Sequence, residues 1–155
     1  MNERVAQLIK QLRLEPHPEG GYFAEDYRSP LRVHWHAADR NAGTHIHYLL
    51  RSGEISCWHR IDADEIWHLY EGGPLHLYLL TEDFSFYRLH LAAGEEYRQV
   101  VPAGCWQAAS CTAPYALVGC TVFPGFEFSQ FSLLRDFKEQ KERMLELHPE
   151  FDRFL

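Results

Sequence analysis

Short segments in which hydrophobic and polar residues alternate fill the middle of the chain, and this period of two is typical of β-strands with one buried face. Glycine, proline or acidic turn residues separate most of these segments. The predicted strands are residues 22–28, 44–50, 54–61, 65–70, 75–80, 85–90, 99–101, 106–110 and 116–123. So many short strands at this spacing predict an antiparallel sandwich or barrel rather than a parallel α/β sheet.

The period changes at both ends of the chain. Near the start, one face of a helix would carry Val5, Leu8, Ile9 and Leu12. Pro16 and Pro18 follow this helix and end it. Hydrophobic residues recur every three or four positions from 133 to 145, so a second helix is expected there, with Pro149 beyond its end. A loop is expected over residues 39–43. The chain is therefore predicted to be one mainly all-β domain, residues 1–155, with a short helix at each end.

Composition excludes several classes of protein. The 155 residues are 46% hydrophobic and 24% charged, which is an ordinary globular balance. A net charge of -7 argues against a nucleic-acid partner, because phosphate backbones require a basic surface. No hydrophobic run approaches the roughly 20 residues of a membrane span, and residues 1–14 lack a signal-peptide core. The cysteines form no CxxC pair and lie in hydrophobic segments, so we expect buried, reduced thiols in a cytoplasmic protein.

A histidine and a glutamate lie on two neighbouring predicted strands. Strict alternation places Ile55, Cys57 and Ile61 on the face of His59, and Ser56, Trp58 and Arg60 on the other face. Glu65 shares its face with Trp67 and Leu69. Burying two titratable groups costs several kcal/mol unless they are paired, hydrogen-bonded or bound to metal. The pair therefore predicts either a buried hydrogen bond that only orients the barrel, or a site for metal binding or proton transfer.

The spacing around this pair resembles the first cupin motif: glycine, five residues, histidine, one residue, histidine, three or four residues, glutamate, six residues, glycine. Gly53, His59, Glu65 and Gly72 match this pattern. Ile61 stands where the motif has its second histidine.

The second cupin motif, Pro-x-Gly-x-x-His, is matched by Pro102 and Gly104, while Gln107 stands at the histidine position. By resemblance, the metal ligands would be His59, Glu65, Gln107 and, if its strand lies alongside, His47. A neutral amide is a poor donor to Zn²⁺ or Fe²⁺, so this set is weak. We expect no tightly bound cofactor and at most weak binding of a divalent metal.

The whole chain resembles one family of small cupins of unknown function, related in fold to the dTDP-4-dehydrorhamnose 3,5-epimerases. The matching segments run from about residue 12 to 135 and include Pro16–Phe23, Trp58–Arg60, Asp64–His68, Val100–Gly104 and Trp106–Ala109. The resemblance implies the jelly-roll barrel (double-stranded β-helix) and a homodimer, but no particular reaction. The expected dimer surface consists of outward residues that are too hydrophobic for a solvated sheet face, namely Trp58, Ile66, His68 and Tyr70.

Other histidines offer weaker signals. His34 and His36 share one strand face, as do His45 and His47, but neither pair falls at a cupin ligand position. We expect the first pair to be exposed or at an interface. For the second pair, which lies on a predicted barrel strand, both a surface role and a role as ligands are retained as alternatives. His17, between two prolines, is expected in a loop near the pocket mouth.

Three functions are compatible with these residues. In the first, the protein is a metal-independent isomerase or epimerase of a small polar, carbohydrate-like metabolite. His59 abstracts a proton, Glu65 fixes its tautomer and Tyr48 returns a proton. The second is a metal-dependent enzyme, and the third is a small-molecule binder without catalysis. The ligand-binding candidates are Tyr22, Glu25, His47, Trp67, Gln107 and Phe126.

Overall fold

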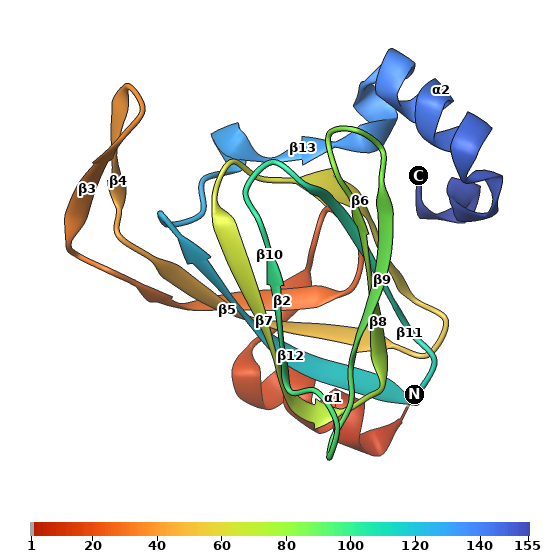
Figure 1. Ribbon diagram of the computed structural model, residues 1–155. Helices are drawn as coiled ribbons and strands as arrows, with labels where there is room; N and C mark the ends of the chain where they lie inside the picture. The colour runs from red at the N-terminus through yellow and green to blue at the C-terminus, as the bar shows by residue number, and fades with distance from the viewer. Residues whose placement is uncertain (1) are drawn as a thin grey trace.

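Two antiparallel β-sheets pack face to face and form most of the protein, as Figure 1 shows for the computed structural model, which describes residues 2–155. The larger sheet has the order β1 (Glu15–Pro16), β2 (Tyr22–Arg28), β5 (Thr44–Arg51), β12 (Tyr115–Phe123), β7 (Asp64–Gly72) and β10 (Arg98–Val101). The smaller sheet has the order β13 (Ser132–Leu133), β6 (Ile55–Arg60), β11 (Trp106–Cys111), β8 (Leu75–Leu80) and β9 (Phe86–Leu91). This is the predicted jelly-roll architecture.

The space between the two sheets is filled by alternate side chains from both. On β8, Leu75, Leu77 and Leu79 face this interior, while His76 points to the other side. Tyr48 and Trp67 pack edge to face there, with ring centroids 5.7 Å apart. The period of two in the sequence therefore corresponds to the real interior of the barrel.

Helix α1 (Glu3–Leu12) closes the outside of the larger sheet, as its sequence predicts. The side chain of Asn2 caps the helix by accepting a hydrogen bond from the backbone N–H of Arg4 at 2.9 Å. Val5 and Leu8 are buried against Leu49 and nearby residues of the sheet. The hydrophobic face of the helix thus covers the outer side of β5 and β12.

The C-terminal segment covers the outer face of the smaller sheet. It contains the 3₁₀ helices η1 (Phe128–Gln130), η2 (Leu134–Asp136) and η3 (Pro149–Phe154) and the helix α2 (Lys138–Leu147). The α-helix starts later than the spacing predicts, because residues 132–133 pair with β6 instead. Trp58 is only 1% exposed and packs against Phe151 and Phe154. Its predicted place on a dimer surface is therefore wrong.

Residues 32–41 form a hairpin that the hydrophobic pattern does not reveal. Strands β3 (Arg32–Trp35) and β4 (Ala38–Asn41) pair only with each other and stand away from the barrel, at the left of Figure 1. The expected loop over residues 39–43 is thus partly wrong. This hairpin buries Arg40 but no hydrophobic face, so it shows no hydrophobic period. His34 lies exposed on it, 3.0 Å from Asp39.

A β-bulge in β6 reverses the alternation that the sequence suggests. His59 is opposite Gln107, but Ser56 is opposite Ala109, so two residues of β6 face one residue of β11. Ser56 therefore faces the interior, and Ile55 packs with Trp58 on the outer side. The expected positions of Ile55 and Ser56 are exchanged, because a bulge shifts the side-chain period by one.

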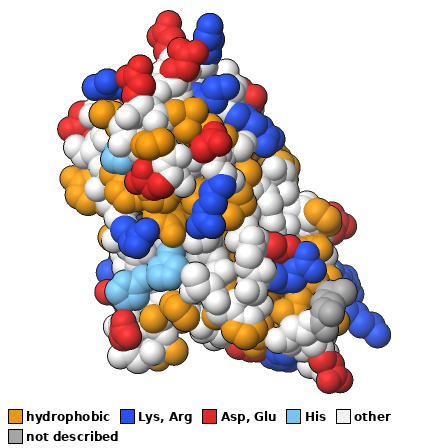
Figure 2. Space-filling view, turned by 90° about the vertical axis from the view of Figure 1, so that its right-hand side faces the viewer, with side chains coloured by type: hydrophobic (Ala, Val, Ile, Leu, Met, Phe, Trp, Pro, Cys, Tyr) orange, Lys and Arg blue, Asp and Glu red, His pale blue; other side chains and the backbone are white. Residues whose placement is uncertain are grey.

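The remaining surface features are ordinary for a globular protein. All four cysteines are free, as predicted, but only Cys111 and Cys120 are buried, whereas Cys57 and Cys105 are half-buried. No helix within residues 2–155 is both long and apolar enough to cross a bilayer. The face drawn in Figure 2 mixes side chains of both charges with hydrophobic ones, rather than gathering basic residues into one patch.

Candidate active site

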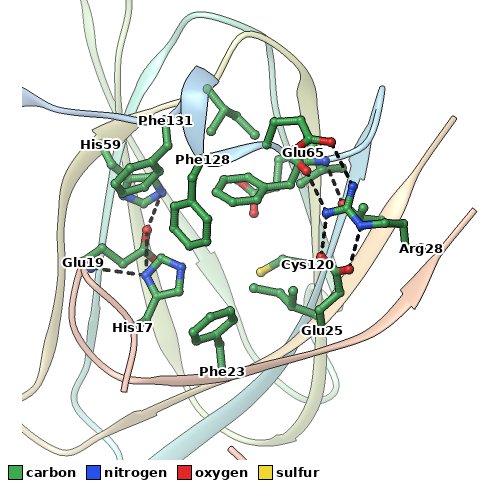
Figure 3. A pocket seen from close by; sticks show the side chains of 16 residues that line it. His17, Glu19, Phe23, Glu25, Arg28, His59, Glu65, Cys120, Phe128 and Phe131 are labelled. Atoms are coloured by element: carbon green, nitrogen blue, oxygen red, sulfur yellow. Dashed lines mark hydrogen bonds and ion pairs between the residues drawn. The ribbon is translucent and has the colours of Figure 1, made fainter. Parts of the chain in front are cut away.

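A cavity of about 100 Å³ lies inside the barrel, between the two sheets. Its lining combines buried titratable groups with phenylalanine rings (Figure 3). The residues that carry its chemistry are His17, Glu19, His59, Glu65 and Arg28. Phe126, Phe128 and Phe131, from the segment that leads into β13, form one wall, and Phe23 forms another.

A tight turn before β2 brings Glu19 into this cavity. The backbone N–H of His17 donates to the carbonyl of Gly21 at 3.0 Å, and Gly20 donates back to the carbonyl of His17 at 3.0 Å. Gly20 has φ +109, and a Cβ there would lie 2.2 Å from the carbonyl oxygen of Ile55. Only glycine therefore lets the turn approach β6 this closely.

Glu19 and His59 form a buried pair, although they come from distant parts of the chain. Oε2 of Glu19 lies 3.1 Å from Nε2 of His59, and their side chains are 7% and 4% exposed. Burial raises the pKa of Glu19 from 4.5 to about 8. Burial also lowers the pKa of His59, although the charge of Glu65 opposes this effect. Near neutral pH the pair therefore shares one proton, which Glu19 carries toward the neutral imidazole.

A backbone carbonyl fixes the tautomer of His59. The carbonyl of Cys57 accepts a hydrogen bond from Nδ1–H of His59 at 2.7 Å. Nε2 must then present a lone pair to Glu19. Sequence reasoning assigned this orienting role to Glu65, but a backbone carbonyl performs it.

His17 is a neutral hydrogen-bond donor on the same side of the cavity. Its Nδ1 accepts the backbone N–H of Glu19 at 3.2 Å, so the ring proton resides on Nε2. Burial, and then the proximity of His59, lower the pKa of His17 to about 3. Aromatic rings surround the imidazole, with the centroid of Phe23 at 4.5 Å. His17 thus offers an N–H without bringing a positive charge.

Glu65 is held by a directional chain of hydrogen bonds. The indole N–H of Trp67, which can only donate, bonds to Oε1 of Gln107 at 3.0 Å. The amide nitrogen of Gln107 therefore donates to Oε2 of Glu65, at 2.6 Å. Burial raises the pKa of Glu65, although the His59 charge opposes this. When Glu65 is protonated, its proton must lie on Oε1, because Oε2 already accepts.

Arg28 lies at the rim, and its charge is already matched. Its guanidinium donates twice to Glu25, at 2.8 and 2.9 Å, and once to Glu127 at 3.1 Å. It also donates to Asn41 and to the carbonyl of Phe126. With its donors occupied, Arg28 has little capacity left for an anionic ligand.

The structure brings some of the predicted site residues together and separates others. His59, Glu65, Glu25 and Phe126 line the cavity. Tyr48 lies deeper, and its hydroxyl donates to the carbonyl of Gly20 at 2.7 Å. The others lie elsewhere: Tyr22 packs under α1, His47 lies on the outer face of the larger sheet, and Trp67 and Gln107 lie beneath Glu65.

The residues at the cupin metal positions do not fit a metal ion. The oxygen of Gln107, its only ligating atom, accepts from Trp67, and Ile61 has no donor. Nε2 of His59 is engaged by Glu19. Within residues 2–155, three His or Asp side chains do bring their ligand atoms within 4.8 Å of one another. They lie on the outer face of the larger sheet, outside the cavity.

Sequence reasoning did not identify Glu19 and Arg28 as site residues, whereas it expected His17 in a loop near the pocket mouth, and His17 lines the cavity. The segment from Pro16 to Phe23 contributed to the family resemblance, and a charged residue between proline and two glycines was the available signal. No local pattern shows that this turn folds over β6, because the contact joins residues about 40 positions apart along the chain.

A jelly-roll barrel that encloses a buried carboxyl–imidazole pair defines a cupin without the usual metal-binding triad of histidines. The chain belongs to the Cupin superfamily (DUF985) family, whose model matches residues 6–134.

Three similar proteins carry no assigned activity in their names. A hypothetical protein from Leishmania major has a similar structure, with a TM-score of 0.82, 30% identity, and coverage of 96% of this chain and 95% of that one. Protein SO0799 from Shewanella oneidensis has a TM-score of 0.74, 36% identity and coverage of 82% of each chain. Uncharacterized protein YML079W from Saccharomyces cerevisiae is 28% identical over 88% of this chain and 78% of its own length.

Proposed function

We propose that the protein is a metal-independent isomerase or epimerase that moves a proton within a small, uncharged, carbohydrate-like metabolite. The observation that carries this proposal is the Glu19–His59 pair, 3.1 Å apart and lining the cavity. General acid–base catalysis is most efficient when the catalytic pKa lies near the working pH. Burial gives Glu19 such a pKa, about 8.

In the proposed reaction, Oε1 of Glu19, the oxygen that does not contact His59, accepts a proton from the carbon next to a substrate carbonyl. The proton on Oε2 passes to Nε2 of His59, so Glu19 stays neutral and His59 becomes an imidazolium. The electron pair of the broken C–H bond moves to the carbonyl oxygen and forms an enolate. Nε2–H of His17 donates to this oxygen, which stabilises the negative charge. If Glu19 delivers the proton to the former carbonyl carbon and the neighbouring hydroxyl passes its proton to the enolate oxygen, the product is the isomer. If Oε1–H of Glu65 protonates the original carbon from its other face, the product is the epimer, and the proton held by the Glu19–His59 pair then returns to Glu65, which restores all three groups.

The electrostatics of the cavity favour an uncharged substrate. Its buried groups are held largely in their neutral states, and the charge of Arg28 at the rim is matched by two carboxylates. An anionic ligand would lose its hydration without gaining a free cation. The phenylalanine rings supply apolar surface for the C–H faces of a polyol or sugar.

The test uses a panel of aldoses, ketoses and hydroxyketones, screened by melting-temperature shift in the presence of EDTA. Each hit is incubated with the protein in D₂O, and replacement of C–H by C–D is followed by proton NMR. We expect Glu19→Gln to keep binding but to slow exchange by about 100-fold or more. The matched control is Glu95→Gln, which alters a Glu–His pair of 3.0 Å on the surface and should exchange like the wild type.

Three outcomes would refute the proposed reaction. The first is exchange by the Glu19→Gln variant at the wild-type rate. The second is exchange that stops in EDTA, which would indicate a metal-dependent enzyme. The third is binding of probes without exchange of any carbon-bound proton, which would make the protein a small-molecule binder and not an isomerase.

A further inference from the structure

A second cluster of titratable side chains lies on the outer face of the larger sheet, outside the cavity. It consists of Asp26 on β2 and of His45 and His47 on β5, and one ligand atom from each lies within 4.8 Å of the others. Nδ1 of His45 is 2.5 Å from Oδ1 of Asp26, and Nδ1 of His47 is 3.3 Å from Oδ2. Both imidazoles therefore direct the same ring nitrogen at one carboxylate.

A β-bulge in β2 places Asp26 in this cluster. Glu25 is opposite Ile46, and Tyr27 is opposite His45, so Asp26 is the extra residue between two paired positions. Glu25 and Ile46 line the cavity, whereas Asp26 extends over the outer face beside the histidines. The two faces of β2 thus serve different sites.

Neighbouring residues hold His45 in an orientation suited to metal binding. Nε2 of His45 lies 2.8 Å from the hydroxyl of Tyr70, so an Nε2–H tautomer can donate to this oxygen and leave the Nδ1 lone pair free. Gly119 lies directly beneath. A Cβ there would lie 2.3 Å from the Tyr70 hydroxyl and 2.5 Å from Nε2 of His45. The absence of a side chain at residue 119 is therefore a condition for this arrangement.

We propose that Asp26, His45 and His47 bind a divalent transition-metal ion, with Zn²⁺ as the probe. Two imidazole nitrogens and one carboxylate oxygen suit Zn²⁺, Ni²⁺ or Cu²⁺, whereas Ca²⁺ and Mg²⁺ require mainly oxygen ligands. Ligands that lie about 2.0 to 2.2 Å from a tetrahedral Zn²⁺ are about 3.3 to 3.6 Å apart. The separation of 3.3 Å between Nδ1 of His47 and Oδ2 of Asp26 matches this spacing, whereas the 2.5 Å contact of His45 must lengthen when the ion binds. The ion needs the Nδ1 lone pairs of both imidazoles, so the ring proton of each lies on Nε2 when the ion is bound.

The three side chains are 43%, 18% and 22% exposed, so the ion keeps an open coordination position that faces solvent. Such a site exchanges its metal with solution and differs from a closed structural zinc site, which has four protein ligands. The ion would join β2 to β5 across the bulge. Because it binds only the folded chain, it would raise the free energy of unfolding.

The experiment is calorimetric titration of ZnCl₂ into the full chain after removal of metal with EDTA. We expect one ion per chain. Because loss of an outer-shell partner already costs about 10- to 100-fold in affinity, His47→Ala and Asp26→Asn should each lose more than about 100-fold, and Tyr70→Phe about 10-fold. Circular dichroism checks that each variant is folded. The matched control is His34→Ala, which removes an exposed histidine that also contacts an aspartate at 3.0 Å.

The absorption of Co²⁺ bound to the wild type gives a second readout that needs no variant. Ligand-field bands typical of nitrogen and oxygen ligands support the proposal. It is overturned if Co²⁺ produces no such bands, or if His47→Ala binds Zn²⁺ like the wild type. It is also overturned if His34→Ala loses as much affinity. Loss in His59→Asn with retention in His47→Ala would place the ion in the cavity, which contradicts the proposal.

Discussion

Replacing Glu19 with glutamine should change how the stability of the protein depends on pH. Glutamine has the same shape and can donate to Nε2 of His59 as the protonated carboxyl does, but it cannot ionise. The pKa of Glu19 is raised in the folded state, to about 8 from 4.5. The contribution of Glu19 to the free energy of unfolding is therefore fully present below pH 4.5 and is lost as the pH rises through about 8. The reason is that the unfolded chain releases this proton at a lower pH than the folded protein does.

The size of the effect follows from the shift. Each pKa unit corresponds to about 1.4 kcal/mol, so the wild type should lose about 3 kcal/mol between about pH 5 and 7.5 through this one group. His17 acts in the opposite direction, because its pKa is lowered to about 3 and its contribution is lost as the pH falls below 6.5. His17 is present in both proteins, so the difference between wild type and Glu19→Gln removes its effect.

The assay is urea unfolding of both proteins across this pH range, with the slope m checked for equality. We expect Glu19→Gln to gain about 3 kcal/mol on the wild type as the pH rises over that interval. Glu95→Gln, in which the altered carboxylate is exposed, should follow the wild type. Curves for wild type and Glu19→Gln that stay parallel within about 0.5 kcal/mol would show that Glu19 is ionised in the folded state, and the reasoning would fail.

Three further predictions concern other parts of the structure. Trp67→Phe should destabilise the fold by about 1–3 kcal/mol, because it leaves the buried oxygen of Gln107 without a donor; urea unfolding measures this, and an unchanged midpoint would contradict it. Gly20→Ala should be destabilised by more than about 1 kcal/mol, since φ is +109 and its Cβ would lie 2.2 Å from the carbonyl oxygen of Ile55. A thermal melt equal to that of the wild type would count against this. We propose that the protein is a homodimer, as the family resemblance implies, so light scattering in EDTA should give about twice the 18.2 kDa monomer mass. A monomer at micromolar concentration would exclude it.

The sequence predicts the barrel well because its strands bury one face, and a buried face imposes a period of two. The same reason explains what the sequence does not predict. The β3–β4 hairpin buries no hydrophobic face and so leaves no hydrophobic pattern. The bulge in β6 exchanges the faces of Ile55 and Ser56 without any change in composition. His59 and Glu65 could be placed in the cavity from motif spacing. Glu19 could not, because a turn held by backbone hydrogen bonds brings it to His59.

The bulge in β2 has a consequence for how related sequences should be aligned. Glu25 and Arg28 both face the cavity although three positions separate them, because Asp26 and Tyr27 lie together on the outer side. Deleting one of these two residues would restore regular pleating and turn every residue on one side of the deletion to the opposite face. A one-residue gap at this point in a homologue therefore changes which side chains meet the ligand, even where the flanking residues are identical. Residues of homologues that carry the gap must be compared by the face they occupy and not by their column in the alignment.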